Sequence, residues 1–266
     1  MIIDFHTHVF PDRIAASAIE RLEKAINTTA STDGTLTGLL SSMDKNGVDM
    51  SVILPVATKA AQFVNIASFA SSINQQYSDK VLSFGGIHPD CVNYRKELNI
   101  IADLGCKGVK IHPDHQHVMI DDIRFLRIID YATELGLVVI THAGIDVSME
   151  NSAYCPPKRM RKVLDEVKPE KMVLAHMGGW GMWDDVYDCI AGENVFLDTA
   201  FIYHALPKEQ FLKIVEKHGS DKILFGSDSP WSDMGKAVDW IKSLSLPKEV
   251  EEGIFSGNAK RLLGMN

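Results

Sequence analysis

Short apolar runs alternate with longer amphipathic segments along the whole chain. The run Leu-Val-Val-Ile at residues 137–140 is apolar at every position, which is typical of a strand buried on both faces of a parallel sheet. In the segments between such runs, apolar residues recur three and four positions apart, as do Ile14, Ala18, Ile19 and Leu22, and this spacing predicts helices. Strands that alternate with helices indicate the βαβ connectivity of an α/β fold.

The alternation predicts eight strand–helix units. Strands are expected at residues 2–9, 50–56, 81–87, 108–112, 137–142, 172–176, 195–199 and 223–228. Helices are expected at residues 11–27, 36–46, 59–77, 94–104, 121–135, 184–191, 207–218, 234–244 and 248–255, with one more that ends near residue 167 and a short tail around 258–263. Eight units fit a closed (β/α)8 TIM barrel better than an open sheet. Without a linker or low-complexity tract, we expect one domain over residues 1–266.

Composition excludes several classes of protein. The chain has 266 residues, of which 45% are hydrophobic, and a net charge of −8. A general nucleic-acid or anionic-membrane binder would need a basic face, and no apolar run approaches the ~18 residues of a membrane span, so we expect neither partner. The four cysteines form no Cys-x-x-Cys pair, which argues against thiolate zinc sites and disulfides. With no signal-peptide pattern, we expect a cytoplasmic protein.

Nine of the ten histidines fall at the C-terminal end of a predicted strand or in the loop just beyond it. They are His6, His8, His88, His112, His115, His117, His142, His176 and His204, and only His218 lies in a helix. Barrel enzymes build their active sites at this end of the strands. Side chains two residues apart in a strand share a face, so the imidazoles of His6 and His8 can reach one metal ion.

The sequence predicts a divalent metal site from residues at three strand ends. His6 and His8 end the first strand and His142 ends the fifth. Asp228 ends the eighth, where a carboxylate is costly unless it is paired. Three imidazoles and one carboxylate suit Zn²⁺ and related ions and leave a position for water. We expect one Zn²⁺ ion, with His176 as a ligand of a second ion or as a general acid or base.

Other polar residues of the barrel mouth remain open to two interpretations. Lys110 has the same strand parity as His112, and both are expected to face inward. We favour a buried lysine with its amine in the mouth over a modified lysine that bridges two metals. The remaining histidines of the mouth are either hydrogen-bonded structural residues or exposed loop residues; they are His88, His112, His115, His117 and His204.

Motifs on four of these strands resemble the amidohydrolase superfamily. They are His6-x-His8, Thr141-His142-Ala143-Gly144, Ala175-His176-Met177-Gly178-Gly179 and Gly226-Ser227-Asp228-Ser229-Pro230-Trp231. The chain is most similar to the amidohydrolase-related branch that includes aminocarboxymuconate-semialdehyde decarboxylase, as residues 108–113 and 257–262 also indicate. The resemblance implies a TIM barrel with one zinc, or with two metals bridged by a carboxylated lysine. It implies metal ligands at His6, His8, His142 and Asp228, with His176 close to the metal-bound water.

This branch contains both hydrolases and non-oxidative decarboxylases, so the reaction stays open. The leading hypothesis is hydrolysis of a C–N or C–O bond in a small organic substrate by metal-activated water. Asp228 would then move the proton, and His176 would orient the water or stabilise the oxyanion. The alternative is a carboxy-lyase that acts on a carboxylated aromatic or dienoic acid, with the proton from His176 or Asp228. A third hypothesis is a barrel that binds metal without catalysis.

The sequence also suggests which residues contact the substrate. Lys110 or Arg159 would hold a substrate carboxylate, and aromatic residues after strands six to eight would form a wall for a flat substrate. The predicted contacts are Lys110, His112, Trp180, Tyr203 and Trp231. Barrels of this kind often dimerise, so a homodimer is a further expectation.

Overall fold

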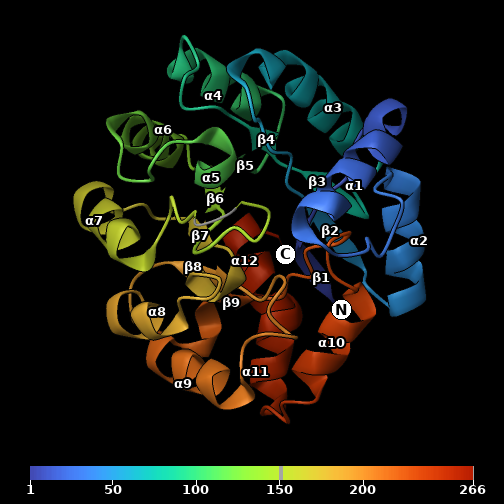
Figure 1. The fold of residues 1–266 in the computed structure, drawn as a ribbon, viewed down its shortest axis with the longest axis vertical. Helices are drawn as coiled ribbons and strands as arrows, with labels where there is room; N and C mark the ends of the chain where they lie inside the picture. Colours follow the sequence, from blue (N-terminus) through green and yellow to red (C-terminus); the bar gives the residue numbers. More distant parts are fainter. Residues whose placement is uncertain (150–151, 266) are drawn as a thin grey trace.

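The computed structural model describes residues 1–149 and 152–265, and its strands form a parallel barrel (Figure 1). One sheet contains, in order, β1 (Ile3–Thr7), β2 (Met50–Ile53) and β3 (Val81–Ser83). The other sheet follows chain order through β4 (Gly85–Gly86), β5 (Gly108–Ile111), β6 (Val138–Thr141), β7 (Met172–Leu174), β8 (Phe196–Asp198) and β9 (Ile223–Leu224). The paired strands of both sheets are parallel, as the βαβ pattern predicts.

Backbone hydrogen bonds join the two sheets on both sides. Only Phe84 separates β3 from β4, and its N–H donates to the Ile53 carbonyl at 2.9 Å, so β3 and β4 together serve as one strand of the barrel. On the other side, the Phe5 N–H of β1 donates to the Phe225 carbonyl, just after β9, at 2.8 Å. The closed eight-strand arrangement expected from the sequence is therefore present.

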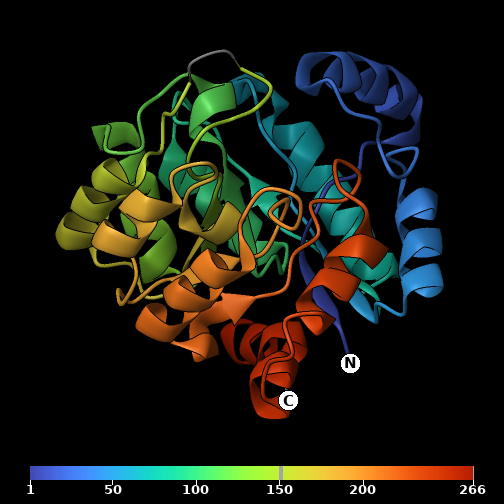
Figure 2. The ribbon, with the colours of Figure 1, turned by 60° about the horizontal axis from the view of Figure 1, so that its bottom comes forward.

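Helices surround the barrel on its outer face (Figure 1). They are α1 (Asp12–Ile26), α2 (Leu36–Asn46), α3 (Phe63–Gln76), α4 (Tyr94–Asp103), α6 (Ile123–Glu134), α7 (Pro157–Val167), α8 (Trp183–Cys189), α9 (Lys208–His218), α10 (Met234–Lys242) and α11 (Lys248–Glu252). In Figure 2, α1 (dark blue) lies beside the rim of the barrel rather than along its wall. Among the described residues, no helix combines the length and the apolar character that crossing a membrane requires.

Apolar side chains fill the inside of the barrel. Phe5, Val138 and Ile140 belong to one interior cluster that draws alternate residues from the strands. The last helix, α12 (Asn258–Leu263), adds Leu262 and Leu263 to this cluster. Figure 1 shows α12 near the axis of the barrel. The functional groups at the C-terminal strand ends therefore face the other, open mouth.

Several element boundaries differ from those predicted. The third strand breaks at Phe84, and the eighth is shorter than predicted because the chain turns away after β9. The predicted tail at 258–263 is the helix α12, which forms because one of its faces is buried under the barrel. Shorter helical segments also occur. α5 (Pro113–Gln116) and η3 (Ser220–Lys222) lie in predicted loops, and η2 (His176–Gly178) begins at the end of a predicted strand. η1 (Ala60–Gln62) and the π-helical η4 (Gly253–Gly257) overlap predicted helices.

Phe84 offers a test of the barrel interior. Its ring is fully buried and packs edge to face on Phe5 with 5.9 Å between ring centroids. We expect Phe84→Ala to lower the free energy of unfolding by about 3–5 kcal/mol, because it leaves a cavity inside the barrel. Urea unfolding followed by tryptophan fluorescence measures the loss. Val92→Ala, at a fully exposed position, should change stability by less than ~0.5 kcal/mol, and equal losses would contradict the assignment.

Candidate metal centre

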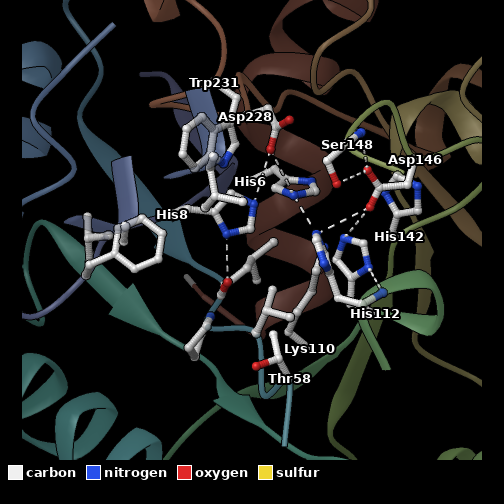
Figure 3. Close-up of a pocket in the computed structure, with 18 of the residues that line it drawn as sticks. His6, His8, Thr58, Lys110, His112, His142, Asp146, Ser148, Asp228 and Trp231 are labelled. Carbon is white, nitrogen blue, oxygen red and sulfur yellow. Dashed lines mark hydrogen bonds and ion pairs between the residues drawn. The ribbon is translucent and has the colours of Figure 1, made fainter. Parts of the chain in front are cut away.

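The closure of the barrel brings His6, His8 and Asp228 together (Figure 3). The Asp228 N–H donates to the His6 carbonyl at 2.8 Å, and the His8 N–H donates to the Ser229 carbonyl at 2.7 Å. The side chains converge on the same point, since Asp228 Oδ1 lies 3.3 Å from His6 Nε2 and 3.2 Å from His8 Nε2. Among the described residues, this is one of two groups of His and carboxylate side chains that could hold a metal ion.

The backbone that carries Asp228 is tightly constrained. A Cβ at Gly226 would lie 2.9 Å from the His6 Cβ, so a larger residue would push this segment away from β1. Asp228 itself has a φ of +68°, a conformation that is uncommon outside glycine and is maintained only where the surroundings impose it. Both features end the extended strand before Asp228 and hold its carboxylate at the barrel mouth.

Hydrogen bonds from the scaffold orient both imidazoles for metal binding. His6 Nδ1 lies 2.7 Å from Asp198 Oδ2, and His8 Nδ1 lies 2.8 Å from the Leu54 carbonyl. Both partners can only accept, so each Nδ1 carries the ring proton and each Nε2 keeps its lone pair. Asp198 is fixed in turn by the backbone N–H groups of His176 and Ala200. This arrangement of second hydrogen-bonding partners is typical of metal-binding histidines, so the residues fit a divalent ion.

His142 and His176 lie beside this group as a pair. His176 Nδ1 donates to the Ala200 carbonyl at 2.8 Å, which leaves its Nε2 unprotonated in the neutral ring and 3.1 Å from His142 Nδ1. The other ring nitrogen of His142 is buried without a hydrogen-bond partner among the described residues, and its nearest carboxylate oxygen, of Asp114, is 3.9 Å away. His142 is not part of the three-residue group, so its role as a fourth ligand stays a prediction.

The amine of Lys110 lies next to His6, one of the three candidate metal ligands. Its side chain is buried, and Nζ lies 3.3 Å from His6 Nε2. Burial lowers the pKa of Lys110 to about 8, although Asp198 and Asp228 act in the opposite direction, so in the metal-free chain the amine is mostly cationic at neutral pH. Burial also acts to raise the pKa of Asp228, but His6 and His8 outweigh it and the pKa is lowered. The mouth thus holds a buried cation beside an anionic carboxylate.

A cavity of about 380 Å³ opens over these groups. Its polar floor contains His6, His8, Lys110, His142, His176 and Asp228. Its walls are largely apolar and come from the helices at the rim and from the loops after the strands, including Ile14 and Leu22 of α1, Ile66 of α3, and Trp231. The cavity can therefore enclose a mostly apolar molecule whose polar end reaches the candidate metal ligands.

The predicted substrate contacts divide into two groups. Lys110, His112, Trp180 and Trp231 line the cavity. Tyr203 is absent from the described lining residues, and its ring packs against His204 with 5.2 Å between centroids. Arg159, the other predicted carboxylate partner, donates instead to Asp121 at 2.8 Å and does not line the described cavity.

Asp198 is a site residue that the sequence analysis missed. It ends β8, and its carboxylate orients His6. The sequence did contain a signal, because Asp198 follows apolar residues at the end of a buried strand, as Asp228 does, and a buried carboxylate needs a partner.

Comparison with known proteins identifies one matching family. The family model described as Amidohydrolase matches residues 3–265. No curated protein matches the chain significantly.

Solved structures share the fold over nearly the whole chain. The 5-carboxyvanillate decarboxylase of Sphingomonas paucimobilis has a TM-score of 0.74 at 17% identity, covering 100% of this chain and 99% of that one. A 2,6-dihydroxybenzoate decarboxylase complexed with 2,6-dihydroxybenzoate has a TM-score of 0.72 at 15% identity, covering 99% of each chain. A dihydroxybenzoic acid decarboxylase of Polaromonas sp. JS666, with bound manganese and the inhibitor 2-nitroresorcinol, has a TM-score of 0.73 at 14% identity, covering 99% and 96%. These similarities confirm the predicted TIM-barrel fold.

Removal of two imidazoles tests the metal centre directly. The double variant His6→Ala and His8→Ala should lose its tightly bound divalent ion, because Asp228 and the predicted fourth ligand His142 cannot retain it by themselves. Metal analysis after gel filtration measures the content. His204→Ala, which removes an exposed imidazole, is the matched control and should keep the ion. Full metal content in the double variant would show that the ion binds elsewhere.

Asp198 should affect metal affinity without touching the ion. Asp198→Asn keeps the side-chain shape but removes the negative charge that holds the proton on His6 Nδ1. We expect roughly 10–100-fold weaker metal binding, as for other hydrogen-bonding partners of metal-bound histidines. Competition with a chromophoric chelator measures the affinity. Asp44→Asn, at an exposed position, should change nothing, and an unaltered affinity in Asp198→Asn would contradict the orienting role.

Proposed function

Because the chain belongs to the amidohydrolase family, we propose that it is a metal-dependent carboxy-lyase that releases CO₂ from a carboxylated aromatic or dienoic acid. The three named structures support this choice, since they are decarboxylases of carboxyvanillate or dihydroxybenzoate. At 14–17% identity they share only the fold with this chain. The proposal therefore depends on the chemistry of the site itself.

The buried amine of Lys110 is the observation that carries the proposal. Within the described chain, Lys110 makes no ion pair with a carboxylate, although its side chain is buried. A buried ammonium whose only direct polar contact among the described residues is an imidazole is costly, and an anion supplied by the substrate would complete its charge pairing. A substrate carboxylate that enters the cavity would meet this ammonium next to His6. Hydrolysis of a neutral amide or ester would not supply that anion.

The walls of the cavity suit an aromatic or conjugated carbon skeleton. Trp231 packs near Phe10 with 6.4 Å between ring centroids, and Trp180 packs near Phe201 with 6.3 Å between them, and all four line the cavity. Flat rings pack well against such surfaces. Apolar walls also exclude water from a bound carboxylate, and loss of hydration favours a transition state in which the charge spreads over the carbon skeleton.

The proposed ion is Zn²⁺, held by His6, His8 and Asp228, with His142 as the predicted fourth ligand. When bound, a divalent ion supplies Lewis-acid polarisation of oxygen groups on the substrate. The donor set also accepts manganese and related ions, and manganese is present in the Polaromonas structure.

Decarboxylation requires a proton donor near the carbon that loses CO₂. The C–C bond breaks, its electron pair stays on that carbon, and one proton must replace the departing group. Two groups on the cavity floor can hold this proton, His176 at Nε2 and Asp228 at its carboxylate. The Ala200 carbonyl fixes the tautomer of His176, so His176 can take up a proton at Nε2, and deliver it to the substrate, once its contact with His142 Nδ1 opens.

An assay of the products distinguishes this reaction from hydrolysis. The enzyme loaded with Zn²⁺ or Mn²⁺ is incubated in ¹⁸O-labelled water with hydroxybenzoates, vanillate derivatives and dienoic acids, and separately with lactones and amides. We expect CO₂ from at least one carboxylic acid, with no ¹⁸O in the organic product. Hydrolysis of a lactone or amide, with ¹⁸O incorporation and no CO₂, would instead support the hydrolase hypothesis that the sequence alone favoured.

Lys110 should matter chiefly for binding the substrate carboxylate. Lys110→Met keeps the length of the buried side chain and removes the charge. Loss of a charge-assisted hydrogen bond of about 1.5–3 kcal/mol predicts a roughly 10–150-fold lower kcat/KM for the carboxylic acid. Steady-state kinetics of CO₂ release measure it, and metal content is checked in the same sample.

Lys107→Met is the matched control, because Lys107 precedes the same strand but is exposed. Its kinetics should equal those of the unmodified protein. If Lys110→Met kept full kcat/KM with normal metal content, the substrate carboxylate would have to bind elsewhere.

A further inference from the structure

A second group of potential metal ligands lies in the same cavity. His112 precedes α5, His115 belongs to α5, and Asp146 lies in the loop after β6. Asp146 Oδ2 lies 3.4 Å from His115 Nε2 and 3.7 Å from His112 Nε2. His112 and Asp146 are buried, His115 is half-buried, and all three line the cavity. This group is separate from the candidate ligands His6, His8 and Asp228.

The distances within the group match the spacing of ligands around one ion. Side-chain hydrogen bonds between N–H and O span ~2.7–3.2 Å, so contacts of 3.4 and 3.7 Å are too long to serve as good ones. Two ligand atoms that each lie ~2.0–2.1 Å from a tetrahedral ion are about 3.3 Å apart. The first group shows similar separations, 3.2 and 3.3 Å. The second group therefore encloses space for a cation at the same scale.

Hydrogen bonds within its own loop orient the Asp146 carboxylate toward the two imidazoles. Its Oδ1 accepts from the Ser148 N–H at 2.8 Å and from the Ser148 hydroxyl at 2.7 Å. The other oxygen, Oδ2, is left to face the two imidazoles, as Figure 3 shows for Asp146, Ser148 and His112. A carboxylate fixed on one oxygen and directed with the other into a buried pair of imidazoles is a preorganised cation ligand.

We propose that His112, His115 and Asp146 bind a second divalent cation of the zinc, cobalt or manganese class. The His112 ring stacks on His142 with 4.5 Å between centroids and 8° between planes, so this site borders the predicted fourth ligand of the first. Both groups open on one cavity. A second cation there would hold a polar group of the substrate remote from the reacting carboxylate. The site itself is independent of which reaction the enzyme performs.

The second site is expected to be the weaker of the two. The His115 N–H points at His112 Nδ1 over a long distance of 3.4 Å, and this contact needs an unprotonated Nδ1. A cation on His112 Nε2 requires the ring proton on Nδ1, so cation binding must break the contact. At the first site no such exchange is needed, because both Nδ1 atoms already face acceptors.

Metal titration of the metal-free full chain tests the proposal. Zn²⁺ and, separately, Co²⁺ are titrated against a chromophoric chelator, and stoichiometry is confirmed by equilibrium dialysis. We expect two ions per chain, the second bound at least tenfold more weakly. Asp146→Asn and His115→Ala should each remove only the weaker ion, whereas the His6→Ala, His8→Ala double variant should remove only the tighter one.

His117→Asn is the matched control, since His117 is exposed, lies next to the site and has a positive φ that asparagine tolerates. It should bind both ions. His115→Ala alters a half-buried position and keeps the test valid if Asp146→Asn fails to fold, as circular dichroism will show. One ion per chain in the unmodified protein, or a second ion that survives both substitutions, would overturn the proposal.

Discussion

The candidate metal centre depends on the backbone hydrogen bonds that close the barrel between its first and last strands. The bond from the Asp228 N–H to the His6 carbonyl places two ligands from opposite ends of the chain side by side. The buried carboxylate of Asp4 strengthens the same junction, because its Oδ1 accepts from the N–H groups of Ser227 and His6. Gly226 lets the segments approach this closely. The fold and the site are thus stabilised by the same contacts.

The scaffold also determines which atoms of the site remain available. A neutral imidazole can bind a metal through either ring nitrogen. A hydrogen-bond acceptor beside one nitrogen keeps the proton there and leaves the other nitrogen free to bind the metal. Asp198, the Leu54 carbonyl and the Ala200 carbonyl provide these acceptors for His6, His8 and His176. All three rings consequently keep an unprotonated Nε2. That of His176 faces His142 Nδ1, whereas those of His6 and His8 converge on Asp228 Oδ1, which is the arrangement that a shared cation requires.

Most polar groups of the cavity lie on its floor and most apolar groups on its walls. This separation restricts where a substrate can carry charge. The floor concentrates imidazoles, carboxylates and one amine, whereas the walls are mostly apolar, although Arg13 and Arg21 of α1 and Asn65 of α3 also line the cavity. A substrate that fits floor and walls has a charged end at the floor and a mostly apolar or aromatic body. Carboxylated aromatic acids have this distribution. The second histidine group adds one polar position on the wall, which would suit a further oxygen substituent on such a body.

The sequence by itself determined the eight-unit α/β pattern and the location of most site residues at strand ends, because burial on both faces and helical spacing leave local signatures. It also determined that the imidazoles of His6 and His8 lie side by side, because residues two apart in a strand point to the same face. Only the tertiary structure decided how His142 pairs with His176, that Asp198 orients His6, that Tyr203 and Arg159 stay out of the cavity, and that His115 meets Asp146. These relations depend on barrel closure and loop paths, which join residues distant in sequence, and such contacts leave no local pattern.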